Sequence, residues 1–248
     1  MKTYFLPCAV CGSIESERIA PIENMQAIVI CRHCGLVYRN PQVPGLRPAA
    51  GTVDDIALQT RARAWAEDIS KRVTLEAGEY FLDVASGGGF VAQELSRRFP
   101  AAGAVLLEPD MAQIEHAKRR NLAAAVLPSS LEEADLPSGA FSLVIAAGVD
   151  HRFAHHRRDM QTLVDLLAPA GTLYIERTVF IDRYAEQPEA NTWFGREQFR
   201  EYVAQFVEIY EALADGGIFG RKPAATASAP PVTNRYAEHL ARIGAAAR

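Results

Sequence analysis

Long apolar runs, a leader-like start and an excess of positive charge are all missing from this 248-residue sequence. No apolar run approaches the roughly 20 residues that a membrane-spanning helix needs. The first eight residues have no long apolar core, so we expect no signal peptide. The formal net charge of -4 gives no electrostatic footprint for nucleic acid. We therefore expect a soluble cytoplasmic protein with no membrane or nucleic-acid partner.

Cysteine is scarce, and none follows residue 34. The cysteines form two Cys-x2-Cys pairs, each followed by a glycine that permits a tight turn: Cys8, Cys11 and Gly12, then Cys31, Cys34 and Gly35. This spacing is typical of a four-thiolate zinc site, which is closed and therefore structural. Two disulfides or two redox pairs are the alternatives, and a reducing cytoplasm disfavours the disulfides.

The segment around the cysteines predicts a small ribbon. Residues 26–30 have the apolar character of a strand, and residues 36–38 supply its return. Residues 40–48 contain three prolines, which remove backbone donors, and so predict an extended linker.

The most informative stretch is residues 81–89, an apolar run that ends in an acid and three glycines. A helical pattern follows over residues 90–99, and Glu108 closes the next apolar run, residues 104–107. This order is that of a nucleotide-binding βαβ unit. NAD would place its pyrophosphate against Asp83, and like charges repel. S-adenosylmethionine carries a sulfonium and an ammonium instead, so the acid favours the methyl donor.

Four segments resemble the class I S-adenosylmethionine-dependent methyltransferases. Asp83-x-Ala85-x-Gly87-x-Gly89 is similar to their motif I, and Glu108-Pro109-Asp110 to their motif II. Residues 141–146 resemble their fourth strand, and residues 166–173 the turn into their fifth. The resemblance covers roughly residues 54–222. It departs from the family at three positions, where Ala85 and Ala170 replace glycines and Ser142 replaces an aspartate.

The resemblance implies which residues bind S-adenosylmethionine. They are the motif I and motif II residues, the turn near the adenine and the end of the fourth strand: Asp83, Ala85, Ser86, Gly87, Gly89, Glu108, Pro109, Ser129, Ser130, Leu131 and Ala146. One of the two serines replaces the acid that the family often places near the adenine amino group. A plain turn or helix cap explains these serines equally well.

The candidate catalytic residues are Asp150 and His151, which follow the fourth strand, where the family frequently has an acid–histidine pair. A neutral imidazole titrates near operating pH, so His151 is either a general base or a residue that lines the cleft. His155 and His156 lie further along the same loop, and we expect them to be exposed. Further candidates to line the acceptor site are Glu176, Tyr184 and Trp193, and each fits a packing role equally well.

The sequence thus predicts a doubly wound, mostly parallel, Rossmann-like sheet of seven strands with an N-terminal zinc ribbon. We expect the ribbon and linker over residues 1–47, the catalytic domain over residues 48–222, and a flexible tail with a terminal helix over residues 223–248. Residues 207–212 and 217–221 should form the antiparallel pair that ends the sheet.

The leading hypothesis is methyl transfer to a small-molecule acceptor. Many bacterial methyltransferases of small-molecule and sugar pathways look similar in their zinc ribbon, which favours a sugar or natural-product intermediate. The alternatives are an RNA or protein methyltransferase that docks through the ribbon, a non-catalytic binding module of the same fold, and an NAD-dependent oxidoreductase. The sequence leaves the acceptor atom and the oligomeric state open.

Overall fold

The protein is described here by a computed structural model. The structure describes residues 5–21, 26–41, 55–120, 124–150, 153, 155–182, 190–223 and 232–246. Most of the expected linker, His151 and Tyr184 lie outside these residues.

A seven-stranded sheet forms the larger layer of the fold, in the order β10-β11-β8-β7-β4-β5-β6. The five strands from β8 to β6 are parallel, and β11 runs antiparallel to both β8 and β10. The seven strands are β4 (Tyr80–Val84), β5 (Gly103–Leu107), β6 (Ala124–Leu127), β7 (Phe141–Ala147), β8 (Leu167–Glu176), β10 (Glu208–Ala212) and β11 (Gly217–Arg221). The predicted doubly wound sheet and its terminal antiparallel pair are confirmed.

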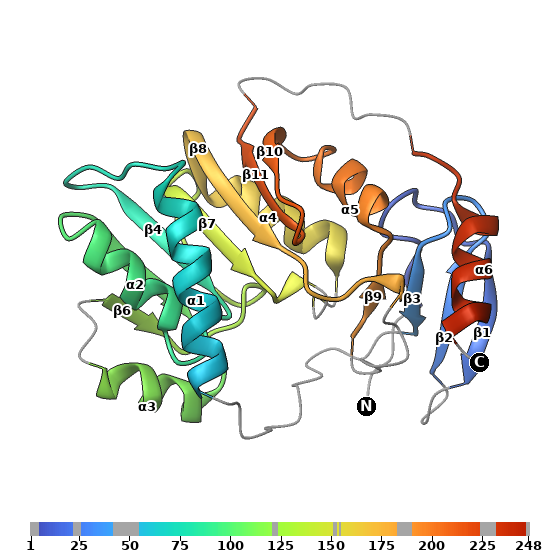
Figure 1. The fold of residues 1–248 in the computed structure, drawn as a ribbon, viewed down its shortest axis with the longest axis horizontal. Helices are drawn as coiled ribbons and strands as arrows, with labels where there is room; N and C mark the ends of the chain where they lie inside the picture. Colours follow the sequence, from blue (N-terminus) through green and yellow to red (C-terminus); the bar gives the residue numbers. More distant parts are fainter. Residues whose placement is uncertain are drawn as a thin grey trace.

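Helices cover both faces of this sheet (Figure 1). On one face, α1 and α2 pack with Phe81, Ile145 and Tyr174 in a continuous apolar cluster. On the other face, α4 and α5 pack in a second cluster that reaches the cysteines of the ribbon. The helices are α1 (Asp55–Ser70), α2 (Phe90–Arg98), α3 (Met111–Arg119), α4 (His156–Leu166), α5 (Arg196–Val203) and α6 (Tyr236–Ala246).

The cysteine-bearing ribbon is part of a second sheet, in the order β1-β2-β3-β9. Its strands are β1 (Ser16–Pro21), β2 (Ala27–Cys31), β3 (Val37–Asn40) and β9 (Thr192–Trp193). The sequence predicted β2 and β3 but neither β1 nor β9. Because β9 comes from the C-terminal half and α6 packs against β2, the three predicted segments of the chain are in direct contact (Figure 1).

None of the helices in the described parts of the chain combines the length and apolar character that crossing a membrane requires.

Candidate functional site

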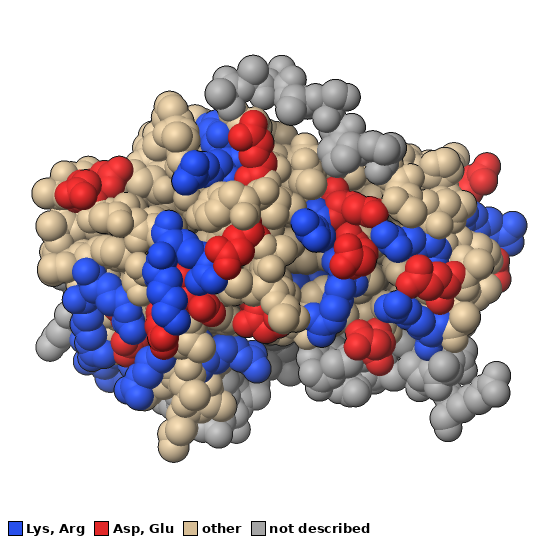
Figure 2. Space-filling view, turned by 45° about the horizontal axis from the view of Figure 1, so that its top comes forward, with Lys and Arg blue, Asp and Glu red and all other residues tan. Residues whose placement is uncertain are grey.

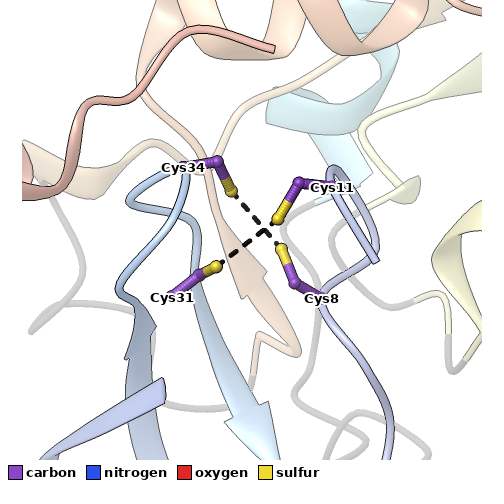
Figure 3. Close-up of side chains that lie close together, drawn as sticks. All are labelled: Cys8, Cys11, Cys31 and Cys34. Carbon is purple, nitrogen blue, oxygen red and sulfur yellow. Dashed lines mark hydrogen bonds between the residues drawn. The ribbon is translucent and has the colours of Figure 1, made fainter. Parts of the chain in front are cut away.

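The four cysteines converge on one point, where their sulfurs all lie within 4.8 Å of one another (Figure 3). The closest pairs are Cys8 and Cys34, with sulfurs 3.4 Å apart, and Cys11 and Cys31, with sulfurs 3.6 Å apart. A zinc ion with four sulfurs at about 2.3 Å separates those sulfurs by about 3.8 Å. The cysteines are free, and their arrangement therefore fits one tetrahedral ion.

Hydrogen bonds between the thiols raise the pKa of Cys8 and Cys34 and lower that of Cys11 and Cys31. The pKa of Cys31 is lowered because the thiols of Cys34 and Cys8 donate hydrogen bonds to its thiolate. The pKa of Cys11 is lowered to about 6, chiefly because the thiol of Cys8 donates a hydrogen bond to the thiolate of Cys11. Thiolates are the form of cysteine that ligates metals.

The turn after the second cysteine pair is enclosed by the C-terminal half of the chain. Gly35 has a φ of +79°, and an added Cβ would lie 2.6 Å from the backbone carbon of Arg235, so only glycine fits here. Gln198 on α5 donates to the carbonyl oxygen of Cys34 at 2.8 Å. His239 on α6 pairs with the carbonyl oxygen of Gly35 at 2.8 Å. Residues far along the chain thus fix the shape of this cysteine turn.

The glycine turn between β4 and α2 has left-handed backbone at three positions. Gly87 and Gly89 have φ values of 55° and 73°, and Ala85 has a φ of 52°, a conformation that disfavours any Cβ. The amide of Gly87 donates to Glu108 Oε2 at 2.7 Å, and the amide of Asp110 donates to Glu108 Oε1 at 2.9 Å. Glu108 therefore ties the end of β5 to the turn after β4.

Asp83 lies at the end of β4 beneath this turn and is only 3% exposed. Its Oδ2 has no hydrogen-bond partner among the described residues. Burial and the nearby charge of Glu108 raise the pKa of Asp83 to about 7, although a hydrogen bond from the Ala92 amide lowers it. A buried acceptor atom without a partner is costly, so this oxygen fits the ammonium of a bound cofactor.

The two serines among the predicted cofactor residues make local hydrogen bonds in the structure, and their cofactor role stays a prediction. Ser129 Oγ donates to the carbonyl oxygen of Ser130 at 3.1 Å, and Ser130 Oγ donates to Glu133 Oε2 at 3.0 Å. Both serines thus close a turn, which is one of the two roles that the sequence left open. Leu131 and Ala146 are buried, and Pro109 is partly exposed beside Glu108.

Asp150 belongs to a fully buried polar network. Its side chain is ion-paired with Arg177, and both side chains are 0% exposed. His156 Nε2 lies 3.4 Å from Asp150 Oδ2, and His156 Nδ1 lies 3.1 Å from the Tyr202 hydroxyl. The expectation that His156 is exposed is wrong, because it begins α4 and packs among aromatic rings.

Sequence reasoning missed Arg177, which holds the carboxyl end of β8 to the ribbon sheet. Its guanidinium donates to Thr192 Oγ1 at 3.1 Å, and its Nε donates to the carbonyl oxygen of Val179 at 2.6 Å. The guanidinium carbon lies 4.8 Å from the ring centre of Phe194 and 5.4 Å from that of Phe199. The sequence offers one weak indication of this role, which is that the charged Arg177 comes directly after the apolar strand β8.

The comparisons with known proteins agree with this geometry. A parallel sheet with a glycine turn and acids at its carboxyl edge is typical of Rossmann-like folds that bind nucleotide cofactors. Residues 81–171 match the family model described as a methyltransferase domain.

Curated relatives cover part of the chain. Uncharacterized methyltransferases of Mycobacterium bovis and Mycobacterium tuberculosis are 29% identical to it over 94 residues, 38% of this chain and 48% of each relative. This chain therefore matches about half the length of those relatives.

Solved structures show the same fold. A chain from the complex of the Haloferax volcanii Trm112 methyltransferase activator with its candidate methyltransferase aligns with a TM-score of 0.59 and 14% identity, over 70% of this chain and 97% of that one. An S-adenosylmethionine-dependent methyltransferase of Aquifex aeolicus aligns with a TM-score of 0.54 and 15% identity, over 66% and 98%.

Proposed function

We propose that the protein transfers a methyl group from S-adenosylmethionine to a small-molecule acceptor, a sugar or a natural-product intermediate. The observation that carries this proposal is Asp83 Oδ2, which is buried and has no hydrogen-bond partner within the part of the chain that the structure describes. It lies beneath a turn that Glu108 holds in place. Asp83 and the turn would hold the amino-acid end of the cofactor, and Glu108 would hold its ribose. The cofactor supplies a methyl group that is already activated on a sulfonium.

Two features support a small acceptor. Trp65, Gly148 and Glu176 meet at the carboxyl edge of the sheet, where the ring of Trp65 and Glu176 Oε2 lie 3.4 and 3.7 Å from the position of an added Gly148 Cβ. These are the groups that a compact acceptor at the ends of β7 and β8 would meet. Figure 2 shows basic and acidic side chains interspersed over the visible face, whereas a nucleic-acid site gathers one sign of charge.

We assign Asp150 a positioning role in this reaction and keep His151 as a candidate base. Asp150 is enclosed by Arg177 and His156, so it is not placed to touch an acceptor. Because His151 follows Asp150 directly, the buried ion pair fixes the start of the segment that carries the histidine.

We also propose that Cys8, Cys11, Cys31 and Cys34 hold a structural Zn²⁺. The convergence of the four sulfurs supports this assignment, and the set leaves no coordination position for a substrate. A reduced four-thiolate site suits a cytoplasmic protein.

The test is calorimetric titration of the purified protein with S-adenosylmethionine, S-adenosylhomocysteine and NAD, together with metal analysis. We expect micromolar affinity for both adenosyl ligands, no NAD binding and one zinc per chain. Binding of NAD alone would establish the oxidoreductase alternative. Failure to bind any of the three would favour a non-catalytic module.

Screening then separates the acceptor classes once cofactor binding is established. Methyl transfer to small sugars or natural-product precursors supports the proposal. Transfer only to RNA or protein would replace it with a macromolecular methyltransferase.

A further inference from the structure

Glu176 is a second buried acid at the carboxyl edge of the main sheet. It ends β8 and is 5% exposed, and its Oε2 has no hydrogen-bond partner in the described parts of the chain. A carboxyl group in this state is either a cost to the fold or a group kept for a ligand. Its position in the sheet decides between these two roles.

The register of the strands places Glu176 and Asp83 on the same face of the sheet. Asp83 pairs with Ile145, and Ile145 pairs with Tyr174. Glu176 lies two residues beyond Tyr174, so its side chain points to the same face, the one that α1 covers. Two strand spacings put Glu176 about 10 Å across the sheet from Asp83 and about 7 Å further along the strands.

The groups along this edge follow the order of the strands. Glu108 directly follows β5, Asp83 is the last residue but one of β4, Gly148 directly follows β7, and Glu176 ends β8. If Glu108 holds the ribose and Asp83 the amino-acid end of the cofactor, the positions after β7 and β8 are left for the acceptor. Gly148 lies directly beside this carboxylate, because an added Cβ there would be in ordinary van der Waals contact with Glu176 Oε2, at 3.7 Å.

We propose that Glu176 is a catalytic residue of the acceptor subsite, and that it binds and deprotonates a hydroxyl or amino group of the acceptor. This inference rests on the proposed methyl transfer. As the acceptor's oxygen or nitrogen bonds to the methyl carbon, its proton passes to the Glu176 carboxylate. The electron pair of the broken carbon–sulfur bond stays on sulfur, so charge and atoms balance.

The electrostatic surroundings suit a base that works near neutral pH. Burial raises the pKa of Glu176 to about 7, the fields of Asp215 and Asp150 raise it, and Arg61 and Trp65 on α1 lower it. The buried phenol of Tyr174 is the other titratable group near it. A base with a pKa near the working pH combines availability with proton affinity.

The affinity ratio of two ligands, S-adenosylmethionine and S-adenosylhomocysteine, tests the placement without any acceptor. They share every group that Asp83 and Glu108 would bind, but only the first carries a charged sulfur. An ionised Glu176 on the acceptor side of that sulfur favours the sulfonium. We expect calorimetry to show a preference for S-adenosylmethionine that grows about fivefold between pH 6 and pH 8.5.

Matched variants assign the effect to one residue. Glu176→Gln should reduce the pH dependence of the ratio to the part that the ionisation of Asp83 supplies, and should leave the affinity for S-adenosylhomocysteine within twofold. Asp215→Asn removes the same charge from a nearby exposed acid and should keep the pH dependence. With any acceptor that gives turnover, Glu176→Gln should lower kcat at least a hundredfold and flatten its rise through pH 7.

Three results would overturn the inference. A wild-type ratio that does not change with pH would place Glu176 away from the sulfur, and this result needs no variant to fold. A tenfold loss of S-adenosylhomocysteine affinity in Glu176→Gln would make Glu176 a cofactor ligand. If the wild type binds neither adenosyl ligand, the proposed function itself fails, which is a distinct outcome.

Discussion

Replacing Asp83 by asparagine should raise the free energy of unfolding of the ligand-free protein and lower its affinity for the cofactor. The pKa of Asp83 is raised from 3.8 to about 7, chiefly by burial. Between these values the folded protein binds a proton that the unfolded chain has released. The free energy of unfolding of the wild type therefore falls as pH rises from about 4 to about 7, and then levels off.

The magnitude follows from the shift. The wild type loses stability over about 1.5 pH units, between pH 5.5 and the pKa of about 7. Each unit lowers the free energy of unfolding by about 1.4 kcal/mol, so the whole loss is about 2 kcal/mol. Asparagine keeps the shape and carries no charge. The stability of Asp83→Asn relative to the wild type should thus improve by about 2 kcal/mol between pH 5.5 and pH 8.

Urea unfolding of both proteins at the two pH values, without adenosyl ligands, measures this difference. Glu115→Gln serves as a control, because it removes an acid that is exposed and paired only with Lys118 on the same helix. Calorimetry should show S-adenosylhomocysteine binding to Asp83→Asn at least tenfold more weakly. A stability difference that is the same at both pH values, or an unchanged affinity, would refute the reasoning.

Three further predictions test the backbone, the buried network and the cysteine site. Ala170 has a φ of 61°, so Ala170→Gly should raise the free energy of unfolding in urea by about 0.5–1 kcal/mol; a loss would contradict the strain. Arg177→Met removes the guanidinium that pairs with the Asp150 charge, and the same assay should show a loss of about 3–5 kcal/mol. A loss below about 1 kcal/mol would show that His156 and the other neighbours of Asp150 suffice to stabilise this charge. Metal removal by a chelator, or Cys31→Ser, should speed amide exchange around Gln198 and His239 but not in β4; equal exchange with and without metal would show that the cluster forms without the ion.

The sequence predicted the parts of the fold that depend on neighbours along the chain. The cysteine pairs with their glycines, the turn from Asp83 to Gly89, and the apolar strands of the main sheet are local patterns, and all appear at the expected places. Glu108 could be predicted for the same reason, since a short crossover helix fixes its distance from the turn.

The parts that the sequence did not predict depend on contacts between distant segments. Strand β9 has only two residues. Trp193 belongs to a strand because it pairs with Val37 of β3, which lies far from it in the sequence. His156 is buried because Tyr202 and Phe194 pack over it. The sequence near position 156 does not predict these contacts. A charged residue such as Arg177 is usually exposed, so its burial becomes evident only with Asp150 in place.

The positions of Glu176 and Arg177 suggest why a cysteine cluster accompanies this sheet. The two residues are adjacent at the end of β8, and Glu176 points toward α1 while Arg177 binds Asp150 and the edge strand β9. Strand β9 pairs with β3, whose turn from β2 carries Cys34. A metal at the cysteines would therefore stiffen the ribbon, hold β9 and, through Arg177, fix the backbone that carries Glu176. The ion would thus stabilise the acceptor side of the site from a distance, through the ribbon and β9, without contacting a reacting atom.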